Sequence, residues 1–136
     1  MKIMLDEGAK MPTRAHHWDA GLDLYAREGK YIPAECGVDF DTGVHLDIPK
    51  GFVGLVKSRS GLMMKNNIIT DGTIDAGYTG SIRVKLFNLG CSAYRVEAGD
   101  KIAQLVIIPI AAPPLEVVDS LGHTDRGCNG FGSTGR

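Results

Sequence analysis

The residues best suited to chemistry lie in the stretch 72–80, where one acid, Asp75, and one phenol, Tyr78, stand among three glycines. Closely spaced glycines let a backbone approach a ligand and permit turns with positive φ. The next residues, 82–88, alternate between apolar and charged side chains, which predicts a half-buried β-strand. We expect a turn-forming hairpin before that strand. It either presents Asp75 and Tyr78 from a rigid scaffold as part of a site, or it is an ordinary hairpin in which Asp75 makes a local turn.

Two serines flank an arginine at residues 58–60, directly before the short run 61–65. A serine in that position is an N-cap signal, so we expect one very short helix that begins at Ser58 or Ser60. Backbone N–H groups at a helix start, together with these two hydroxyls and Arg59, could cradle a phosphate. An ordinary helix cap explains one serine but not the whole group, so phosphate binding is the favoured interpretation.

Two polar side chains interrupt strands that are otherwise mostly apolar. Asp23 stands between two leucines in residues 20–26, where it is either exposed on the alternate face or paired; an outward-facing charge is the favoured interpretation. Gln104 is the only neutral polar residue in residues 101–106. A buried amide must find hydrogen-bond partners, so Gln104 either stabilises the structure or contacts a ligand.

The final stretch, residues 123–136, is nearly devoid of large apolar side chains and rich in Gly, Ser and Thr. Such a segment cannot bury enough surface to hold itself in place, so we expect it to be mobile unless something orders it. Its glycines formally match G-x-G-x-x-G, but no strand–turn–helix unit is expected around them, which argues against a dinucleotide site. The composition suits a lid, in which Phe131 stacks on a planar base while Ser133, Thr134 and an arginine meet phosphates. The alternative is an unstructured terminus.

The composition excludes several classes of protein. Fifteen basic and 16 acidic residues leave a net charge of −1, which argues against a protein that coats nucleic acid or binds membranes through a basic patch. We find no apolar run of transmembrane length and no signal-peptide h-region. The three cysteines are far apart and the four histidines lack metal-ligand spacing, so we expect neither a disulfide framework nor structural zinc, and a cytoplasmic location.

Helical periodicity is almost absent, and short apolar runs recur between glycines and prolines. We predict strands within residues 3–5, 44–48, 52–57, 82–88 and 102–110. This pattern is typical of an all-β barrel or sandwich. No repeat, linker or low-complexity block divides the 136 residues, so we expect one domain.

Five stretches, taken in order, resemble the five sequence motifs of the trimeric dUTPase (deoxyuridine 5′-triphosphate nucleotidohydrolase) family. They are residues 20–26, 57–62, 72–80, 99–105 and 126–135. One such motif is a weak signal, whereas five in order over most of the chain are highly specific. The resemblance implies a homotrimer of distorted jelly-roll β-barrels of the β-clip type. It also implies three active sites shared between subunits, each closed by the tail of a subunit, so that residues 123–136 form a mobile lid on a single domain, 1–136.

The resemblance implies a reaction as well: hydrolysis of dUTP to dUMP and pyrophosphate. Mg²⁺ assists in-line attack of water on the α-phosphate, and the dUMP supplies thymidylate synthesis. Asp75 matches the aspartate that orients and deprotonates the water, and Tyr78 matches the ring that packs under the deoxyribose. Asp23 matches a carboxylate near the phosphate and metal network, with an indirect role in holding Mg²⁺. The other substrate-binding positions that the resemblance implies are Ser58, Arg59, Ser60, Gly61, Gly72, Thr73, Ile74, Lys85, Gln104, Arg126, Phe131, Gly132, Ser133 and Thr134.

Two positions depart from the family pattern. Ile69 stands where many members carry an asparagine that contacts uracil, and Asn129 stands where a glycine is common. Uracil recognition would then rest on backbone groups. The related dCTP deaminase would need a glutamate base in place of Asp75, and a regulatory nucleotide sensor would be expected to lack the base or the tail. Hydrolysis is therefore favoured, with dUTP and further copies of the chain as partners and with neither nucleic acid nor membrane.

Overall fold

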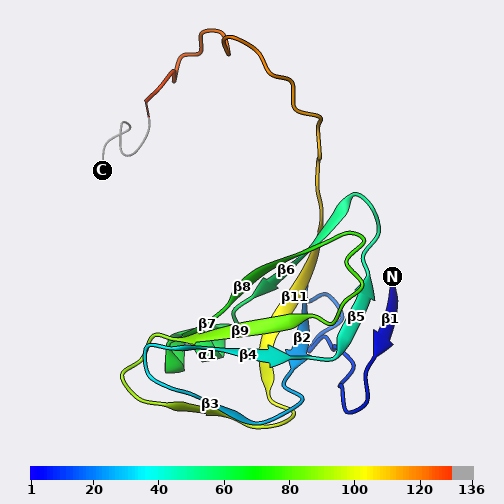
Figure 1. Cartoon of the computed structure of the whole chain (residues 1–136), viewed down its shortest axis with the longest axis vertical. Coiled ribbons are helices and arrows are strands. Elements are labelled where there is room, and N and C mark those ends of the chain that lie inside the picture. Colours follow the sequence, from blue (N-terminus) through cyan, green and yellow to red (C-terminus); the bar gives the residue numbers. More distant parts are fainter. Residues whose placement is uncertain (130–136) are drawn as a thin grey trace.

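Antiparallel strands make up nearly all of the regular structure in residues 1–129, the part of the chain that the computed structural model describes (Figure 1). The strands are β1 (Lys2–Leu5), β2 (Gly21–Tyr25), β3 (Lys30–Ile32), β4 (Gly37–Asp41), β5 (Val44–Asp47), β6 (Phe52–Lys57), β7 (Ile68–Ile69), β8 (Asp71–Asp75), β9 (Arg83–Asn88), β10 (Tyr94–Val96) and β11 (Lys101–Pro109). One seven-residue helix, α1 (Ser60–Asn66), accompanies them within these residues. The predicted all-β class with a single very short helix is confirmed.

The strands form four antiparallel sheets in the described residues. Their strand orders are β2-β11-β6-β8, β4-β9-β7, β1-β5 and β10-β3. Neighbours in a sheet often lie far apart in the sequence: β2 pairs with β11, and β4 with β9. This long-range pairing brings residues 20–26 and 99–105, two of the motif stretches, onto adjacent strands.

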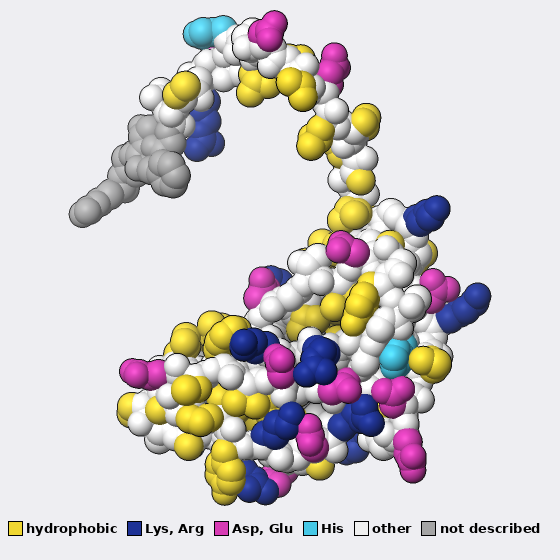
Figure 2. All heavy atoms as spheres, viewed as in Figure 1, with side chains coloured by type: hydrophobic (Ala, Val, Ile, Leu, Met, Phe, Trp, Pro, Cys, Tyr) yellow, Lys and Arg dark blue, Asp and Glu magenta, His cyan; other side chains and the backbone are white. Residues whose placement is uncertain are grey.

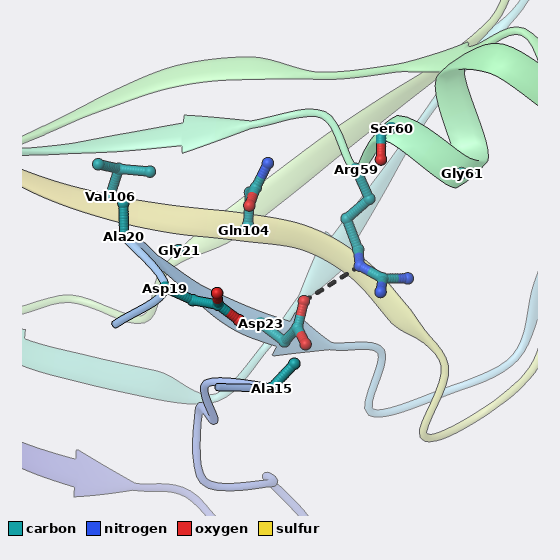
Figure 3. Close-up of a pocket in the computed structure, with 10 residues that line it drawn as sticks. All are labelled: Ala15, Asp19, Ala20, Gly21, Asp23, Arg59, Ser60, Gly61, Gln104 and Val106. Atoms are coloured by element: carbon teal, nitrogen blue, oxygen red, sulfur yellow. Dashed lines mark hydrogen bonds and ion pairs between the residues drawn. The ribbon is translucent and has the colours of Figure 1, made fainter. Parts of the chain in front are cut away.

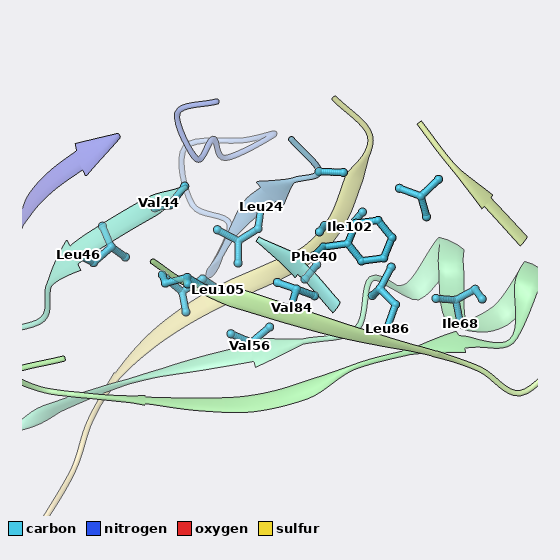
Figure 4. Close-up of a cluster of buried hydrophobic side chains, with 14 of the residues drawn as sticks. Leu24, Phe40, Val44, Leu46, Val56, Ile68, Val84, Leu86, Ile102 and Leu105 are labelled. Atoms are coloured by element: carbon cyan, nitrogen blue, oxygen red, sulfur yellow. The ribbon is translucent and has the colours of Figure 1, made fainter. Parts of the chain in front are cut away.

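The core lies between the sheets and follows from the alternation that the sequence shows. In β9, Val84 and Leu86 are buried while Arg83 and Lys85 are exposed, as predicted. Leu86 packs in one cluster with Phe40 of β4 and with core residues of β11 and β2 (Figure 4). Each fully buried side chain of this size contributes about 1.5–3 kcal/mol, so the core provides the rigid support on which the polar residues are held.

The prediction of a turn-forming hairpin just before the strand at residues 82–88 is wrong. Strand β8 pairs with β6, whereas β9 pairs with β4 and β7, so the two strands belong to different sheets. Residues 76–82 therefore form a corner that crosses from one sheet to the other. Alternation along a strand indicates which face is buried but carries no information about its partner strand, so the pattern alone does not distinguish a hairpin from this crossing.

Helix α1 begins at Ser60 as expected, but the predicted serine N-cap is wrong. The N-cap residue is Arg59, with φ −81° and ψ 132°, and it makes no side-chain cap bond. The Ser58 hydroxyl instead donates to the carbonyl of Thr70 at 2.9 Å and accepts its N–H at 2.8 Å. Ser58 therefore fastens the end of β6 to the segment that leads into β8.

After β11 the chain leaves the barrel (Figures 1 and 2). Ile110 N–H donates to Gly51 O at 2.9 Å, and all side chains from 111 to 129 are exposed. Hydrogen bonds within 111–129 join near neighbours, such as Arg126 Nε to Asn129 O at 3.0 Å. Of the expected lid, 123–136, the structure describes 123–129; Phe131, Gly132, Ser133 and Thr134 lie outside the described residues. Within 1–129, no helix has the length and apolar character needed to cross a membrane.

Candidate active site

A polar pocket of about 440 Å³ opens where β2, β11 and the start of α1 meet (Figure 3). Strands β2 and β11 form one wall, and the residues that follow β6 form the opposite wall. The pocket is lined by Ala15, Asp19, Ala20, Gly21, Asp23, Arg59, Ser60, Gly61, Gln104 and Val106. Three of the five motif stretches thus meet in one place.

The carboxylate of Asp23 is the most buried charge in this pocket, with 13% of its side chain exposed. Arg59 Nε donates to Oδ1 at 3.1 Å, and Lys101 Nζ lies 2.7 Å from Oδ2. The hydrogen bond and the charge of Asp23 raise the pKa of Lys101 above its ordinary value. The favoured interpretation of Asp23 as an outward-facing charge is therefore wrong. Its ion pairs could not be predicted from the sequence, because Arg59 and Lys101 come from distant segments that only the fold brings together.

The pairing holds the Arg59 side chain at the pocket wall. Arg59 Nη1 also reaches the carbonyl of Lys101 at 3.4 Å. About a third of the side chain, 35%, stays exposed, and Nη2 has no hydrogen-bond partner among the described residues while the side chain lines the pocket. A guanidinium fixed at one edge and free at the other is suited to bind phosphate oxygens.

Gln104 joins the two walls of the pocket. Its Nε2 donates to the carbonyl of Ser58 at 3.1 Å, and its Oε1 lies against Gly21. A Cβ on Gly21 would overlap that oxygen, so only glycine leaves the amide its present position. Gln104 is predicted either to stabilise the structure or to contact a ligand. The structural hydrogen bond is present, and the amide also borders the pocket.

The structure brings together only part of the set of residues predicted to bind phosphate. Arg59, Ser60 and Gly61 line the pocket with Gln104, whereas the Ser58 hydroxyl is engaged by Thr70. Ser58 contributes to this arrangement through its carbonyl, which accepts from Gln104. Its side chain supports the wall of the pocket rather than lining it.

The third motif lies away from this pocket within one chain. Asp75 ends β8 opposite Val53, and Tyr78 N–H donates to Asp75 O at 3.1 Å in the turn that follows. Gly77 supports that turn with φ +90°. The Tyr78 hydroxyl donates to Ser81 O at 3.0 Å. Asp75 and Tyr78 are exposed and do not line the pocket.

The other predicted substrate residues also lie elsewhere. Gly72, Thr73 and Ile74 are in β8, paired with β6. Lys85 is on the exposed face of β9, with its Nζ 5.6 Å from the Phe87 ring centroid. Arg126 is exposed in the tail. Within a single chain these residues lie away from the pocket. Their role in binding substrate stays a prediction.

Sequence reasoning missed Lys101 and Gly21. Lys101 follows a turn at Gly99-Asp100, and nothing near it in the sequence identifies Asp23 as its partner. The contact depends on the pairing of β11 with β2, which places Lys101 opposite Tyr25. Gly21 precedes Asp23 by two positions, so both lie on the same face of β2, but only the structure reveals Gln104 beside it.

The pocket residues do not fit a directly bound Mg²⁺. No group of three or more His, Cys, Asp or Glu side chains within residues 1–129 is arranged to hold a metal ion. Both oxygens of Asp23 already face cations, Arg59 and Lys101. Mg²⁺ prefers oxygen ligands that are free to complete an octahedron, so Asp23 is placed to orient basic groups rather than to bind the ion itself.

The fold and the pocket define a class: an all-β protein whose strands and short helix hold an arginine, a hydroxyl and an amide around a site for an anionic ligand. The dUTPase family model matches residues 7–135, and the chain belongs to the dUTPase family. The resemblance stated from the motifs is confirmed, as are the jelly-roll fold and the class of enzyme, a dUTP diphosphatase.

The relatives support this assignment. The chain is 43% identical over 136 residues to deoxyuridine 5′-triphosphate nucleotidohydrolase of Clostridium tetani, covering 98% of this chain and 94% of that protein. A point mutant of the dUTPase of Staphylococcus bacteriophage 80alpha, solved with dUpNHpp, is similar with a TM-score of 0.94 and 32% identity, covering 99% of this chain and 98% of that one. A mutant dUTPase from phage phi11 of S. aureus, reported with a structural Mg(II) ion, gives a TM-score of 0.84 and 31% identity, covering 90% and 98%.

Proposed function

We propose that the chain hydrolyses dUTP to dUMP and pyrophosphate by in-line attack of water on the α-phosphate, with Asp75 as the base that activates the water. The observation that carries this proposal is the pocket in which Arg59, Ser60, Gly61 and Gln104 converge. A triphosphate carries about four negative charges at neutral pH, so its cleavage depends mainly on positioning and charge neutralisation.

Arg59 and its neighbours perform the positioning in this proposal. The Asp23 carboxylate fixes Nε of Arg59, so that the free edge of the guanidinium meets phosphate oxygens in one orientation. Ser60 and Gly61 add a hydroxyl and backbone groups at the start of α1, where, apart from its sequence neighbours and the backbone of its own helix, no described residue crowds Gly61. Gln104 adds an amide. These groups act on the phosphates without needing to react themselves.

Mg²⁺ enters this scheme as the counter-ion of the triphosphate. The phosphate oxygens would supply its ligands, because the described pocket residues offer no cage of their own. When bound to the substrate, such an ion would supply charge neutralisation on the phosphates, while the protein residues position them. Asp23 would influence it only indirectly, through the basic side chains that it orients.

A second copy of the chain completes the site. Asp75 and Tyr78 are exposed at the corner after β8 and are away from the pocket of their own chain. An exposed carboxylate and ring, with no role in their own core, are free to meet a neighbouring copy. We therefore propose the homotrimer that the motifs imply, in which one subunit supplies Asp75 to the phosphate pocket of another.

In this proposal, strand β8 recognises the base. It is the last strand of its sheet and pairs on one side with β6 within the described residues. The other edge of such a strand presents backbone N–H and C=O groups in a fixed pattern, which is the chemistry needed to recognise uracil through Gly72, Thr73 and Ile74. Ile69, in β7, offers no polar side chain for this purpose. Tyr78 would pack under the deoxyribose and exclude a 2′-hydroxyl.

The tail would close over the bound nucleotide. Arg126 would meet the phosphates, and Phe131, Gly132, Ser133 and Thr134 complete the lid in this proposal, with Phe131 stacked on uracil. In a cell the reaction would lower the ratio of dUTP to dTTP and supply dUMP for thymidylate synthesis. We propose the cytoplasm as its location, where such nucleotides are made.

Pyrophosphate release tests the proposal directly. We would offer dUTP, dCTP, dTTP and UTP separately with Mg²⁺ and expect release from dUTP alone. Binding can be followed in parallel by the fluorescence of the only tryptophan, Trp18, which is 91% exposed on the loop beside the pocket residue Asp19. Release from none of the four while dUTP still alters the fluorescence would instead indicate a regulatory nucleotide-binding protein. Ammonia release from dCTP would indicate a deaminase.

A further inference from the structure

One histidine joins the corner that carries Asp75 and Tyr78 to the body of the barrel. His45 lies in the middle of β5, and its ring bridges two segments that are far apart in the sequence. Nδ1 lies 2.8 Å from the carbonyl oxygen of Thr79, the residue after Tyr78. Nε2 lies 3.1 Å from Oδ1 of Asp6, which follows β1.

Both atoms that face the His45 ring are hydrogen-bond acceptors. The Thr79 carbonyl has only lone pairs to offer, so Nδ1 must carry a proton to bond it. The carboxylate of Asp6 also accepts only, so Nε2 must carry a proton as well. A neutral imidazole has one N–H and satisfies one of these contacts, while the other brings two lone pairs together. The ring satisfies both contacts only as the imidazolium.

The charges around His45 favour that form. The hydrogen bond to the Thr79 carbonyl and the charges of Asp6 and Asp41 raise the pKa of His45 above 6.5, although partial desolvation opposes the rise. Arg27 lies 3.3 Å from both of these carboxylates and competes for them. Lys2 and Asp47, on the two strands of the same sheet, line the adjacent hollow and form a 4.0 Å pair of their own that is largely exposed.

A second anchor holds the same corner. The Ser81 hydroxyl donates to Asp41 Oδ1, and the carbonyl of Ser81 accepts from the Tyr78 hydroxyl. The corner is thus fastened at Thr79 through His45 and at Ser81 through Asp41. Arg27 pairs with Asp6 and Asp41 and links the two anchors.

We infer that His45, as an imidazolium between Thr79 and Asp6, is a positioning residue that fixes the turn bearing Asp75 and Tyr78. This inference rests on the proposed role of Asp75. His45 does not touch the substrate. Loss of its proton leaves a lone pair facing a carboxylate or a carbonyl, so one end of the bridge opens and the turn loses a fixed point. The anchoring is present below the raised pKa of His45 in the folded protein and is lost as the pH rises through it.

The protonation state can be measured by NMR on the full chain. We expect the ring of His45, assigned by its absence in His45→Gln, to titrate with a midpoint above 6.5 and to show protons on both nitrogens below it. Asp6→Asn should lower that midpoint because it removes the facing charge. Asp39→Asn is the matched control: it removes a charge of the same sign, one that pairs with Arg83 at 3.6 Å, and should leave the midpoint in place. A midpoint at or below 6.5 would overturn the imidazolium assignment.

The positioning role is tested by the pH dependence of kcat at saturating dUTP. We expect the wild-type kcat to fall about tenfold as the pH rises through the His45 midpoint, since a misplaced base reacts slowly. His45→Gln keeps an N–H for Thr79 but cannot titrate, so its kcat should start lower and lack this fall, with KM little changed. The titration of the substrate is common to both proteins and cancels in the comparison. If kcat of wild type and of His45→Gln depended on pH in the same way, the protonation of His45 would not position the turn, and the role of His45 would be structural only.

The same experiments separate this inference from the proposed function. Full activity of Asp75→Asn would remove Asp75 from the base role and with it the reason to position the turn. A slow Asp75→Asn protein together with parallel profiles for wild type and His45→Gln would overturn the inference and leave the proposed function standing.

Discussion

Asp75 and Arg59 lie at opposite ends of β6. Asp75 pairs with Val53 near the start of that strand, while Arg59 lies two residues beyond its last residue, Lys57. Four strand positions span about 13 Å at ~3.3 Å per residue. This separation supports the proposal that the site draws its base, Asp75, and its phosphate ligand, Arg59, from two copies of the chain.

This separation predicts complementation between two inactive variants. Asp75→Asn and Arg59→Ala should each lower kcat at least ~10²-fold as pure proteins. When the two are unfolded, mixed in equal amounts and refolded together, sites with an intact Arg59 from one chain and an intact Asp75 from another should form. Random mixing places both intact groups in about a quarter of the sites, so about a quarter of wild-type kcat should return.

Pure Asp75→Asn, refolded in the same way, is the control and should stay inactive. Mass spectrometry of the mixture shows whether chains have exchanged. Mixed assemblies without recovered activity would mean that both groups act from the same chain.

Gly21→Ala should weaken substrate binding without unfolding the protein. The added Cβ would overlap Gln104 Oε1 and lie 3.2 Å from Gln104 Cβ and Cδ. Because the overlapping atom ends a flexible side chain, the amide moves aside and gives up its bond to the Ser58 carbonyl. We expect KM to rise about fivefold, the equivalent of one lost hydrogen bond of ~1 kcal/mol, with a small drop in melting temperature.

A double-mutant cycle with Gln104→Ala checks that mechanism. If the effect of Gly21→Ala passes through the amide, it should vanish in the Gln104→Ala background. Additive effects of the two substitutions would mean that Gly21 matters for another reason, such as the backbone of β2.

Asp23→Asn should weaken binding of a non-hydrolysable dUTP analogue about tenfold both with and without Mg²⁺. The reason is that Asp23 pairs with Arg59 at 3.1 Å and with Lys101 at 2.7 Å, and loss of these charge-assisted contacts, which solvent screens in part, frees the guanidinium. Trp18 fluorescence measures the affinity. Asp39→Asn serves as the control for a lost surface charge. A defect seen only with Mg²⁺ would instead assign Asp23 to the metal.

The sequence predicts the strands well where one face is buried. The alternation in residues 82–88 and the run 52–57 give β9 and β6 nearly as they are found. The sequence also indicates that Arg59, Ser60 and Gly61 belong together, because they are consecutive, and all three line the pocket.

What the sequence does not reveal is pairing between distant segments. From the sequence alone, Asp23 is predicted to be a surface charge, because its partner Lys101 comes from the distant strand β11. Ser58 is likewise predicted to cap a helix, because the sequence does not show that Thr70 lies beside its hydroxyl. The corner at residues 76–82 resembles a hairpin because turn chemistry is local, whereas the choice of partner strand depends on the whole core. His45 carries no local signal, since its role depends on Asp6 and Thr79 from other segments.

Ser81→Ala should destabilise the protein in a pH-dependent way. The Ser81 hydroxyl is the main cause of the lowered pKa of Asp41, aided by the Gly43 N–H and by Arg27 and Arg83 and opposed by desolvation. A carboxyl with a lowered pKa stabilises the fold above its unfolded value, near 3.8, and loses this contribution as the pH falls through the folded value. The urea midpoints of wild type and Ser81→Ala should therefore differ at pH 7 and converge as the pH falls through the lowered pKa of Asp41. Ser92→Ala, at an exposed site, should show no such pH dependence, and an equal gap at both pH values would separate Ser81 from Asp41.

Removal of residues 127–136 should abolish most activity while leaving the barrel intact. Side chains from 111 to 129 are exposed, and the described hydrogen bonds of this segment are local, so the segment adds little to the free energy of unfolding. We expect a melting temperature within about 2 °C of the full chain and an unchanged assembly by light scattering, but kcat reduced ~10²-fold or more because the lid no longer excludes water or meets the phosphates. Arg126→Ala is the matched point variant: it keeps the whole tail, should reduce kcat less than the truncation, and should share its unchanged melting temperature. A truncated chain that fails to assemble would show that the tail joins subunits together, and full activity of the truncated chain would remove the lid from the mechanism.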